Sequence, residues 1–201
     1  MKSLTYIIIA IIVITSCSKR TQKVFTIDLP HYSSKIELDR LNNFDTLIVW
    51  NWYNDNMASH RSCYRIQNAE LGIIMENGMA PAKAENFDQM TIKTPITPNK
   101  FPCWPISEWL NKNKENYLSD RPSDKIFILD SLTIDNKRFG VFGIKTMAVQ
   151  TKVIYMTNIN NEAIEFEFHT NLHPAANFYL KSLNMMKTIK IKPGSFNPPH
   201  Q

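Results

Sequence analysis

Apolar and polar residues alternate strictly along one segment in the last third of the chain. In residues 164–169 the apolar positions are Ile164, Phe166 and Phe168, and the polar residues Glu165, Glu167 and His169 alternate with them. Because successive side chains of a strand point to opposite faces, this pattern predicts a strand with one buried and one solvent-exposed face. An asparagine-rich turn joins it to the apolar residues 153–156, and the two segments are predicted to form a hairpin.

A second hairpin is predicted immediately before the first. Residues 132–134 and 139–144 are rich in apolar side chains and flank the short segment Asp135-Asn136-Lys137. Aspartate and asparagine favour the tight turns that connect antiparallel strands. Residues 125–129 are also mostly apolar, so this part of the chain is predicted to build an antiparallel sheet.

Two segments have the spacing of amphipathic helices. Pro174 suits the first turn of a helix, and the residues after it carry an apolar stripe that would lie against the sheet. The stripe consists of Ala176, Tyr179, Leu180, Leu183 and Met186. Earlier in the chain, Ser107 is predicted to cap a helix that ends near Leu118. Its apolar side would carry Trp109, Leu110 and Tyr117.

The first half of the chain is predicted to contribute further strands. Residues 24–29 alternate and stop at Pro30, which is typical of a strand end. Residues 45–53 are apolar on both faces, and we expect them to form a central strand. Residues 62–66 and 70–75 are predicted to be another pair of strands.

These elements predict a single α+β domain over residues 24–192. It would be a twisted antiparallel sheet with packed helices, including a C-terminal helix. Residues 77–105 contain five prolines and little periodicity, so we expect a long middle loop there, and residues 193–201 are predicted to be a flexible tail. Apolar residues make up 43% and aromatic residues 11% of the chain, which is typical of a packed globular domain.

The order of these elements resembles the Mog1/PsbP-like α/β fold. The resemblance rests on residues 25–30, on the two hairpins, and on residues 178–183 followed by 186–189. Two features depart from the pattern: no tryptophan follows Pro30 closely, and the middle region is long. Proteins of that fold are mostly binding or assembly proteins without catalysis, and they include envelope lipoproteins. The resemblance therefore implies a non-catalytic role.

The N-terminus carries the features of an export signal. Lys2 precedes an uncharged run over residues 4–14, and Ile14-Thr15-Ser16-Cys17 follows. So short an apolar run does not span a bilayer core of about 30 Å. The segment resembles the lipobox of bacterial lipoproteins. This resemblance implies that residues 1–16 are a signal peptide, that Cys17 carries lipid such as palmitate, and that residues 17–23 are a lipidated tether.

The resemblance to lipoproteins also indicates where the domain would reside. Residue 18 is serine and not the aspartate that retains lipoproteins in the inner membrane of enteric bacteria, and no acidic run follows Cys17. We therefore expect a domain anchored in the outer membrane that faces the periplasm. The lipid would provide its membrane contact. The formal net charge is +5, but an exported protein rarely meets nucleic acid, so we expect no nucleic-acid partner.

Cys63 and Cys103 are the two remaining cysteines. In an oxidising periplasm they could form one disulfide. Two buried free thiols would give the same sequence, so both interpretations stay open. Neither cysteine belongs to a Cys-x-x-Cys motif or has a histidine nearby in the sequence, which argues against a catalytic thiol.

The best candidate for a metal site is Glu165-x-Glu167-x-His169, with His173 four residues later. Alternate residues of a strand share a face, so two such side chains could converge on one cation. The simpler interpretation is the solvated face of a half-exposed sheet, and we expect neither a metal nor a cofactor. The chain also lacks His-Glu-x-x-His, Gly-x-Ser-x-Gly and glycine-rich nucleotide motifs, so no catalytic residues are assigned and we expect no enzymatic activity.

Four tryptophans could form either core or a docking platform, namely Trp50, Trp52, Trp104 and Trp109. Trp104 lies with Phe101 in a proline-bounded segment, so these two residues are the candidates for partner docking. The predicted function is a protein-binding module of the envelope, such as an assembly factor or an immunity-type inhibitor. The alternative is a small-ligand or glycan binder that uses the tryptophans, and a hydrolase with dispersed residues is a third, less favoured possibility.

Overall fold

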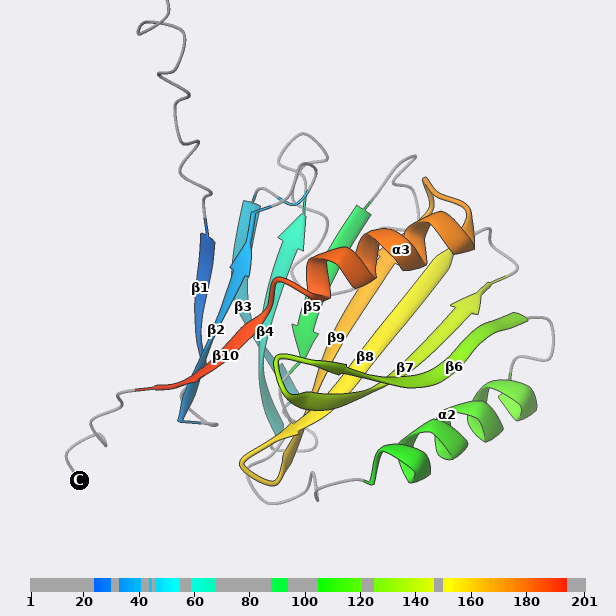
Figure 1. The fold of residues 1–201 in the computed structure, drawn as a ribbon, viewed down its shortest axis with the longest axis horizontal. Coiled ribbons are helices and arrows are strands. Elements are labelled where there is room, and N and C mark those ends of the chain that lie inside the picture. Colours follow the sequence, from blue (N-terminus) through cyan, green and yellow to red (C-terminus); the bar gives the residue numbers. More distant parts are fainter. Residues whose placement is uncertain are drawn as a thin grey trace, which may run out of the picture.

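The computed structural model describes residues 24–29, 33–40, 44, 46–54, 59–67, 88–93, 105–120, 125–146 and 150–194. These residues form two antiparallel sheets and two helices, so the chain folds as a single α+β domain (Figure 1). Within these ranges, no helix has the length and apolar character needed to cross a membrane.

The large sheet has seven strands in the order β3-β4-β5-β9-β8-β7-β6. Its strands are β3 (Thr46–Asn54), β4 (Ser59–Gln67), β5 (Asp88–Lys93), β6 (Lys125–Ile134), β7 (Lys137–Lys145), β8 (Thr151–Ile159) and β9 (Glu162–Thr170). The small sheet has the order β1-β2-β10 and consists of β1 (Val24–Leu29), β2 (Ser34–Asp39) and β10 (Lys190–Pro193). The helices are α2 (Ile106–Asp120) and α3 (Ala175–Met186).

Both predicted C-terminal hairpins are confirmed. Their two-residue turns are Asp135-Asn136 and Asn160-Asn161, and all four residues have positive φ, between 47° and 67°. Asparagine and aspartate tolerate this conformation better than other residues with a side chain, and it matches the twist of the flanking strands. The turns therefore set the registers of β6 with β7 and of β8 with β9, in which Ile134 pairs with Lys137 and Ile159 with Glu162.

The main core lies on one face of the large sheet. Side chains from both sheets and from α3 are buried there, including Ile36 of the small sheet, Phe166 of β9 and Phe178 of α3. The predicted alternation of β9 is confirmed, because Ile164, Phe166 and Phe168 all belong to this core. Helix α3 crosses the same face (Figure 1), and Ser182 at its buried side contacts the Tyr155 hydroxyl of β8 at 2.8 Å.

Helix α2 covers the opposite face near β6 and β7. There Trp109 packs with Phe142, Ile144, Ile154 and Met156 in a second core. A Cβ atom at Gly140 would lie 3.0 Å from Ile106 and 3.1 Å from the Trp109 ring. Glycine at this position of β7 therefore allows the helix to approach the sheet closely. The predicted helix is confirmed, although it begins at Ile106 and Ser107 is not its cap.

Three details of the predicted fold are wrong. The middle loop expected at 77–105 contains β5, which lies between β4 and β9 in the sheet. Its residues Asp88, Gln89 and Thr91 are polar yet buried, so its sequence lacks a simple alternation. The segment 45–53 does form a strand, but β3 ends the order of the described sheet and is not central. Apolar side chains on both faces of a strand indicate that both faces are covered. They do not indicate whether other strands pair with both of its edges.

The third error concerns part of the apolar stripe of α3. Met186 is buried as predicted, and Tyr179 and Leu183 pack against the main core, but Ala176 is exposed and Leu180 is 57% exposed. The other buried residues of the helix are Phe178, Ser182 and Met185, so the buried side includes a small polar residue that the stripe did not include. Strands β2 and β10 were also missed, although Ile36 and Leu38 alternate with charged residues in β2. Residues 70–75 and 195–201 lie outside the described residues.

Candidate functional site

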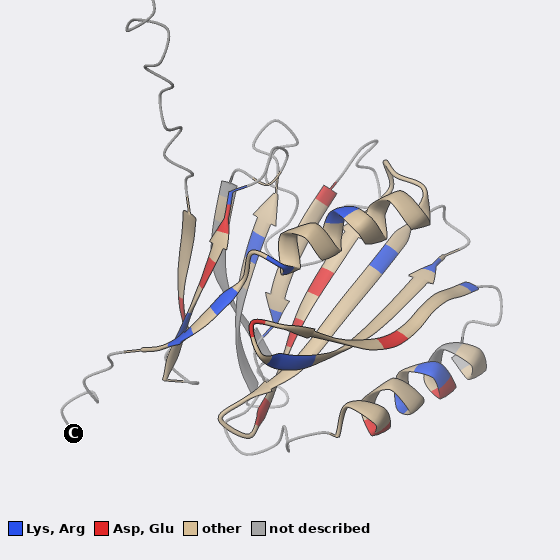
Figure 2. Cartoon of the chain, in the orientation of Figure 1, with Lys and Arg blue, Asp and Glu red and all other residues tan. Residues whose placement is uncertain are grey.

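The polar face of β9 is an ion-pair layer within the sheet and is less exposed than predicted. Glu167 accepts hydrogen bonds from Lys93 of β5 at 2.5 Å and lies 3.0 Å from Lys152 of β8. Figure 2 shows acidic positions of β9 between basic positions of neighbouring strands. Burial raises the pKa of Glu167, but the charges of Lys93 and Lys152 outweigh it and hold that pKa well below its usual range.

The other residues of the candidate metal motif have separate partners. Glu165 accepts the indole N–H of Trp109 at 3.1 Å, and the His169 ring N–H donates to Gln150 at 3.0 Å. His173 lies near Asp88, away from this face. No group of three potential metal ligands converges among the described residues. The motif of alternate polar residues is therefore used for hydrogen bonds and ion pairs in the structure.

His169 is held in its neutral form by its surroundings. Burial lowers its pKa to about 4, and the nearby charge of Lys152 acts in the same direction, while Glu167 opposes them. A neutral imidazole can donate one hydrogen bond and accept another, which suits the contact with Gln150. This histidine is therefore part of the polar layer of the sheet.

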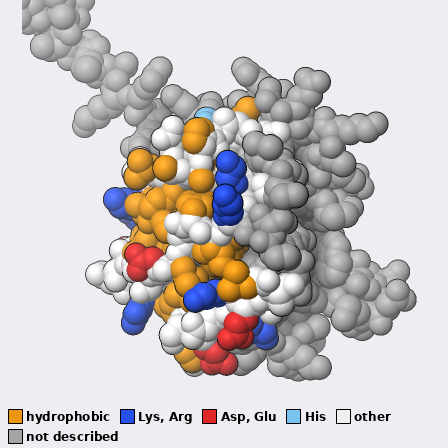
Figure 3. All heavy atoms as spheres, turned by 90° about the vertical axis from the view of Figure 1, so that its right-hand side faces the viewer, with side chains coloured by type: hydrophobic (Ala, Val, Ile, Leu, Met, Phe, Trp, Pro, Cys, Tyr) orange, Lys and Arg blue, Asp and Glu red, His pale blue; other side chains and the backbone are white. Residues whose placement is uncertain are grey.

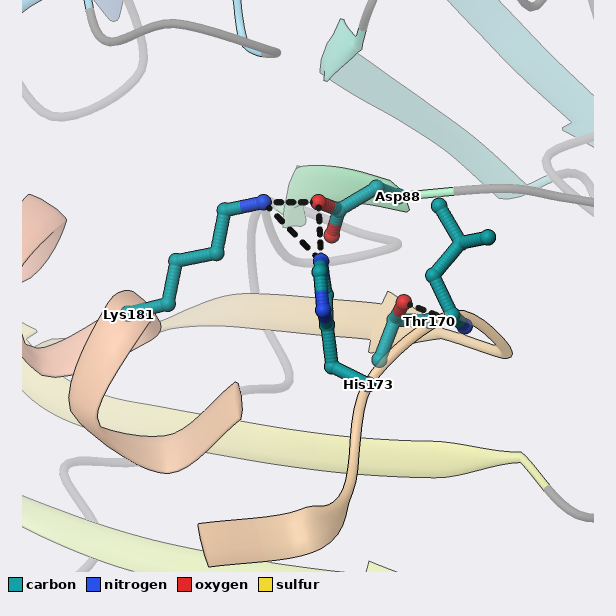
Figure 4. A network of polar contacts seen from close by, with 5 residues as sticks. Asp88, Thr170, His173 and Lys181 are labelled. Carbon is teal, nitrogen blue, oxygen red and sulfur yellow. Dashed lines mark hydrogen bonds and ion pairs between the residues drawn. The ribbon is translucent and has the colours of Figure 1, made fainter. Parts of the chain in front are cut away.

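A second polar cluster joins α3 to β5, and no sequence motif predicted it. Figure 4 shows Lys181 and His173 converging on Asp88, the first residue of β5. Lys181 makes an ion pair with the Asp88 carboxylate, and Nε2 of His173 lies 3.4 Å from the same oxygen. The Asp88 side chain is only 1% exposed. Burial raises the pKa of Asp88, and Lys181 and His173 offset part of that effect.

Aromatic rings complete this cluster. His173 stacks on Phe178 with the ring centroids 6.3 Å apart, and the Lys181 ammonium lies 5.1 Å from the Phe44 ring centroid. The Thr170 hydroxyl accepts the amide of Leu172 at 3.0 Å and orders the turn before α3. These contacts hold α3 and the turn before it against the sheet. This structural role explains the cluster.

The end of the molecule between the two helices is rich in exposed apolar groups. Figure 3 shows apolar side chains spread over this end, with a few lysine or arginine side chains among them. Leu180 on α3 is 57% exposed and Leu129 on β6 is 38% exposed. Leu172, before α3, and Leu118 of α2 are exposed as well. Exposed apolar groups gathered at one end of a domain are typical of interaction sites. We call the part formed by β6, α3 and Leu172 the β6–α3 surface.

Strand β6 contributes Leu129 to this surface and ends the described sheet. It pairs with β7 on one side, and no described strand pairs with its other side. Its register with β7 shifts at Phe127, where the strand bulges. Asp130 accepts the backbone N–H of the next residue, Ser131, at 2.7 Å. The Asp130 charge also faces α3, since burial and this charge together raise the pKa of Tyr179.

The residues predicted to dock a partner or to be modified lie in other parts of the chain. Cys17, Phe101, Cys103 and Trp104 are all outside the described residues. Cys63 lies in β4 and pairs through the backbone with Trp50 and Lys93. Trp109 is buried in the second core and binds Glu165, so this tryptophan is not a docking platform. Leu129 and Leu180 were not predicted as surface residues, because the exposure of an apolar side chain depends on how the elements pack and not on the local sequence.

Comparisons with known proteins identify a fold and no family. No protein-family model matches the chain, and no curated protein matches it. The solution structure of CyanoP, a cyanobacterial PsbP from Synechocystis, aligns with a TM-score of 0.50 at 6% identity, over 88% of this chain and 97% of that one. A Pseudomonas aeruginosa protein of unknown function, described as a putative regulator, aligns with a TM-score of 0.42 at 8% identity, over 89% and 99%.

The chain is thus a single α+β domain with a PsbP-like fold. The antiparallel sheets and the C-terminal helix match the predicted fold class, and the alignment with CyanoP covers nearly all of both chains. At so low an identity the likeness concerns the fold alone, so any function must be argued from the surface of this chain.

Proposed function

We propose that this protein is a non-catalytic protein-binding module whose partner docks on the β6–α3 surface. The observation that carries the proposal is the exposure of Leu129 on β6 and of Leu180 on α3, beside the edge of β6 that no described strand pairs with. Leu180 follows Tyr179, which lies within range of the Asp130 charge of β6. Apolar anchors surrounded by polar residues are typical of protein interfaces. Lysine or arginine side chains lie among the apolar groups on this face (Figure 3), and such a mixture of apolar and charged groups suits a protein partner.

We further propose that the domain works in the bacterial envelope as an assembly factor or an immunity-type inhibitor. The support is the lipobox-like segment that ends at Cys17. Lipid on Cys17 would hold the domain close to the outer membrane on its periplasmic side, because the tether to β1 is only residues 17–23. A module held in this way would meet partners that are themselves in or crossing the envelope.

Lipidation is tested by metabolic labelling with a palmitate analogue. We expect the full-length chain to incorporate the label and to fractionate with membranes. The substitution Cys17→Ala should remove the label completely, since no acceptor thiol remains in the lipobox. Cys63→Ala is the matched control and should keep the label. Equal labelling of the Cys17→Ala variant would contradict the proposed anchor.

Partner docking is tested by placing a charge on the proposed surface. We expect Leu180→Asp to abolish recovery of one stoichiometric partner when the tagged protein is purified gently from native membranes. A carboxylate buried in an apolar interface must be desolvated, which costs several kcal/mol. Because Leu180 is 57% exposed, the same change should alter the stability of the free domain by no more than about 0.5 kcal/mol.

The matched control is Val24→Asp. Val24 is 49% exposed on β1, in the other sheet, so the variant carries the same charge on a different face. We expect it to retain the partner. Loss of the partner in both variants, or no stoichiometric partner for the wild type, would contradict docking on the β6–α3 surface.

A further inference from the structure

We propose that the partner docks by adding an extended strand to the edge of β6 that pairs with no described strand, called the free edge below, where it displaces the Asp130 carboxylate from the Ser131 amide. The inference rests on the proposed function and specifies the kind of partner: a segment in strand conformation, with a basic side chain facing Asp130. It follows from the direction of the backbone groups of β6, from the contact of Asp130, and from what lies beside the edge.

The turn after β6 determines which backbone groups point outward. In a hairpin with a two-residue turn, the residues that flank the turn exchange both backbone hydrogen bonds, and here these are Ile134 and Lys137. Hydrogen-bonded pairs then alternate along the ladder, so Leu132 and Asp130 also bond to β7. The N–H and C=O groups of Ser131 and Thr133 are thus directed to the free edge.

The contact of Asp130 agrees with this assignment. Its carboxylate accepts the Ser131 N–H at 2.7 Å, which places that donor on the side away from β7. The carboxylate oxygen takes the position that a carbonyl of an adjacent strand would take. The same edge also has a bulge at Phe127. Acidic side chains and bulges are devices by which natural sheets prevent unspecific pairing of their edges, so an incoming strand must fit this edge to replace Asp130.

The surroundings favour a strand over other protein shapes. On one face the edge is flanked by α3, where Tyr179 lies near Asp130 and Leu183 packs against the main core. On the other face Leu129 is exposed, in register with Phe142 of the core beneath α2. A strand beside β6 would therefore find apolar contacts for the side chains of both its faces, which is the usual arrangement in strand addition.

The charged residues of β6 indicate which side chains the incoming strand would carry. Between Ile126 and Ile134, Asp130 is the only charged residue of β6. Once it leaves the Ser131 amide, its carboxylate is available for an ion pair with a lysine or arginine of the incoming strand. Lys125 at the start of β6 would suit an acidic residue at the opposite end of that strand. A second copy of this chain is the competing occupant, and the test below detects it.

The test uses a peptide probe with the sequence of residues 137–145, KRFGVFGIK, labelled with fluorescein. This sequence is basic, and in β7 it already pairs with β6 in antiparallel register. Because the protein is itself positively charged, bulk electrostatic attraction does not favour the complex. We expect saturable binding in fluorescence polarisation. A peptide methylated on alternate backbone nitrogens should lose binding, since it cannot form the ladder.

The decisive variant is Ser131→Pro. It removes the outward N–H without removing a bond to β7, and proline is tolerated at such edge positions. Loss of this hydrogen bond should weaken peptide binding about tenfold. Ser131→Ala keeps the amide and removes the hydroxyl that accepts a hydrogen bond from Arg138, so it is the matched control and should bind like the wild type. Circular dichroism and thermal melting verify that each variant folds.

Each alternative result overturns strand addition. Equal binding by Ser131→Pro and the wild type, binding of the methylated peptide, or no binding at all would do so. Light scattering identifies the remaining case, in which the wild type is a dimer that Ser131→Pro converts to a monomer, so that a second copy occupies the edge. If Leu180→Asp abolishes recovery of the natural partner while Ser131→Pro does not, the result supports docking on the β6–α3 surface and contradicts only strand addition to β6.

Discussion

The substitution Lys181→Met is expected to lower the free energy of unfolding by about 3 kcal/mol at neutral pH. It removes the ammonium from the Asp88 ion pair and leaves a carboxylate whose side chain is 1% exposed. A buried charge that loses its partner costs far more than a surface ion pair contributes. Chemical denaturation followed by circular dichroism measures the change.

The penalty should also depend on pH in a defined direction. Burial raises the pKa of Asp88 in the folded protein, and loss of Lys181 raises it further. The folded state then binds a proton that the unfolded state does not bind in the window just above the ordinary aspartate pKa. Stability must therefore fall as pH rises through that window, so Lys181→Met should be least damaging in acid.

Two further variants make this test specific. Asp88→Asn combined with Lys181→Met should recover part of the lost stability, because no buried charge remains. Lys187→Met removes a lysine from an exposed position just after α3 and should change stability by no more than about 0.5 kcal/mol. If Lys181→Met were as mild as Lys187→Met, the cluster would not fasten α3 to the sheet.

Acidification from pH 6.5 towards 4 should destabilise the fold through His169 by about 3 kcal/mol. Burial and Lys152 lower the pKa of His169 to about 4, compared with 6.5 for an ordinary histidine. Within that window the unfolded chain binds a proton that the folded chain excludes, so stability decreases as pH falls. The stability that depends on neutral His169 is fully present above pH 6.5. Urea denaturation at several pH values between 4 and 7 measures it.

The variant His169→Gln isolates this effect. Glutamine does not titrate, so the difference in stability between the variant and the wild type should shift by about 3 kcal/mol across the window. His173→Gln changes the Asp88 cluster instead, so its pH profile separates the contribution of that cluster from that of His169. Glu167 keeps its charge in this range, because the two lysines lower its pKa. Parallel pH profiles for His169→Gln and the wild type would contradict the assignment.

Much of the fold could be predicted because its signals are local. The turns at Asp135-Asn136 and Asn160-Asn161 require residues that tolerate positive φ, and the sequence displays those residues. The alternation in β9 likewise depends only on neighbours along the chain. Strand β5 escaped detection because its polar residues Gln89 and Thr91 are buried beside other strands. Only the tertiary environment shows that such residues belong to a sheet.

The candidate site was harder to predict, for a related reason. Leu180 satisfies the helical spacing of an apolar stripe, yet it is exposed, whereas Ser182 is buried against Tyr155. Spacing along a helix defines its faces but not the angle at which it meets a sheet. The cluster of Asp88, His173 and Lys181 combines residues that are distant in the sequence, so no motif could reveal it.

The order of neighbouring residues was sufficient to predict the α+β class, the two C-terminal hairpins and the two helices. Each of these depends on local properties of the chain, namely turn conformation and side-chain periodicity. The tertiary structure alone decided that Glu165, Glu167 and His169 have separate protein partners, and that β6 ends the described sheet with Leu129 and Leu180 exposed beside it. Burial and exposure depend on which elements meet in space, and that information is spread over the whole chain.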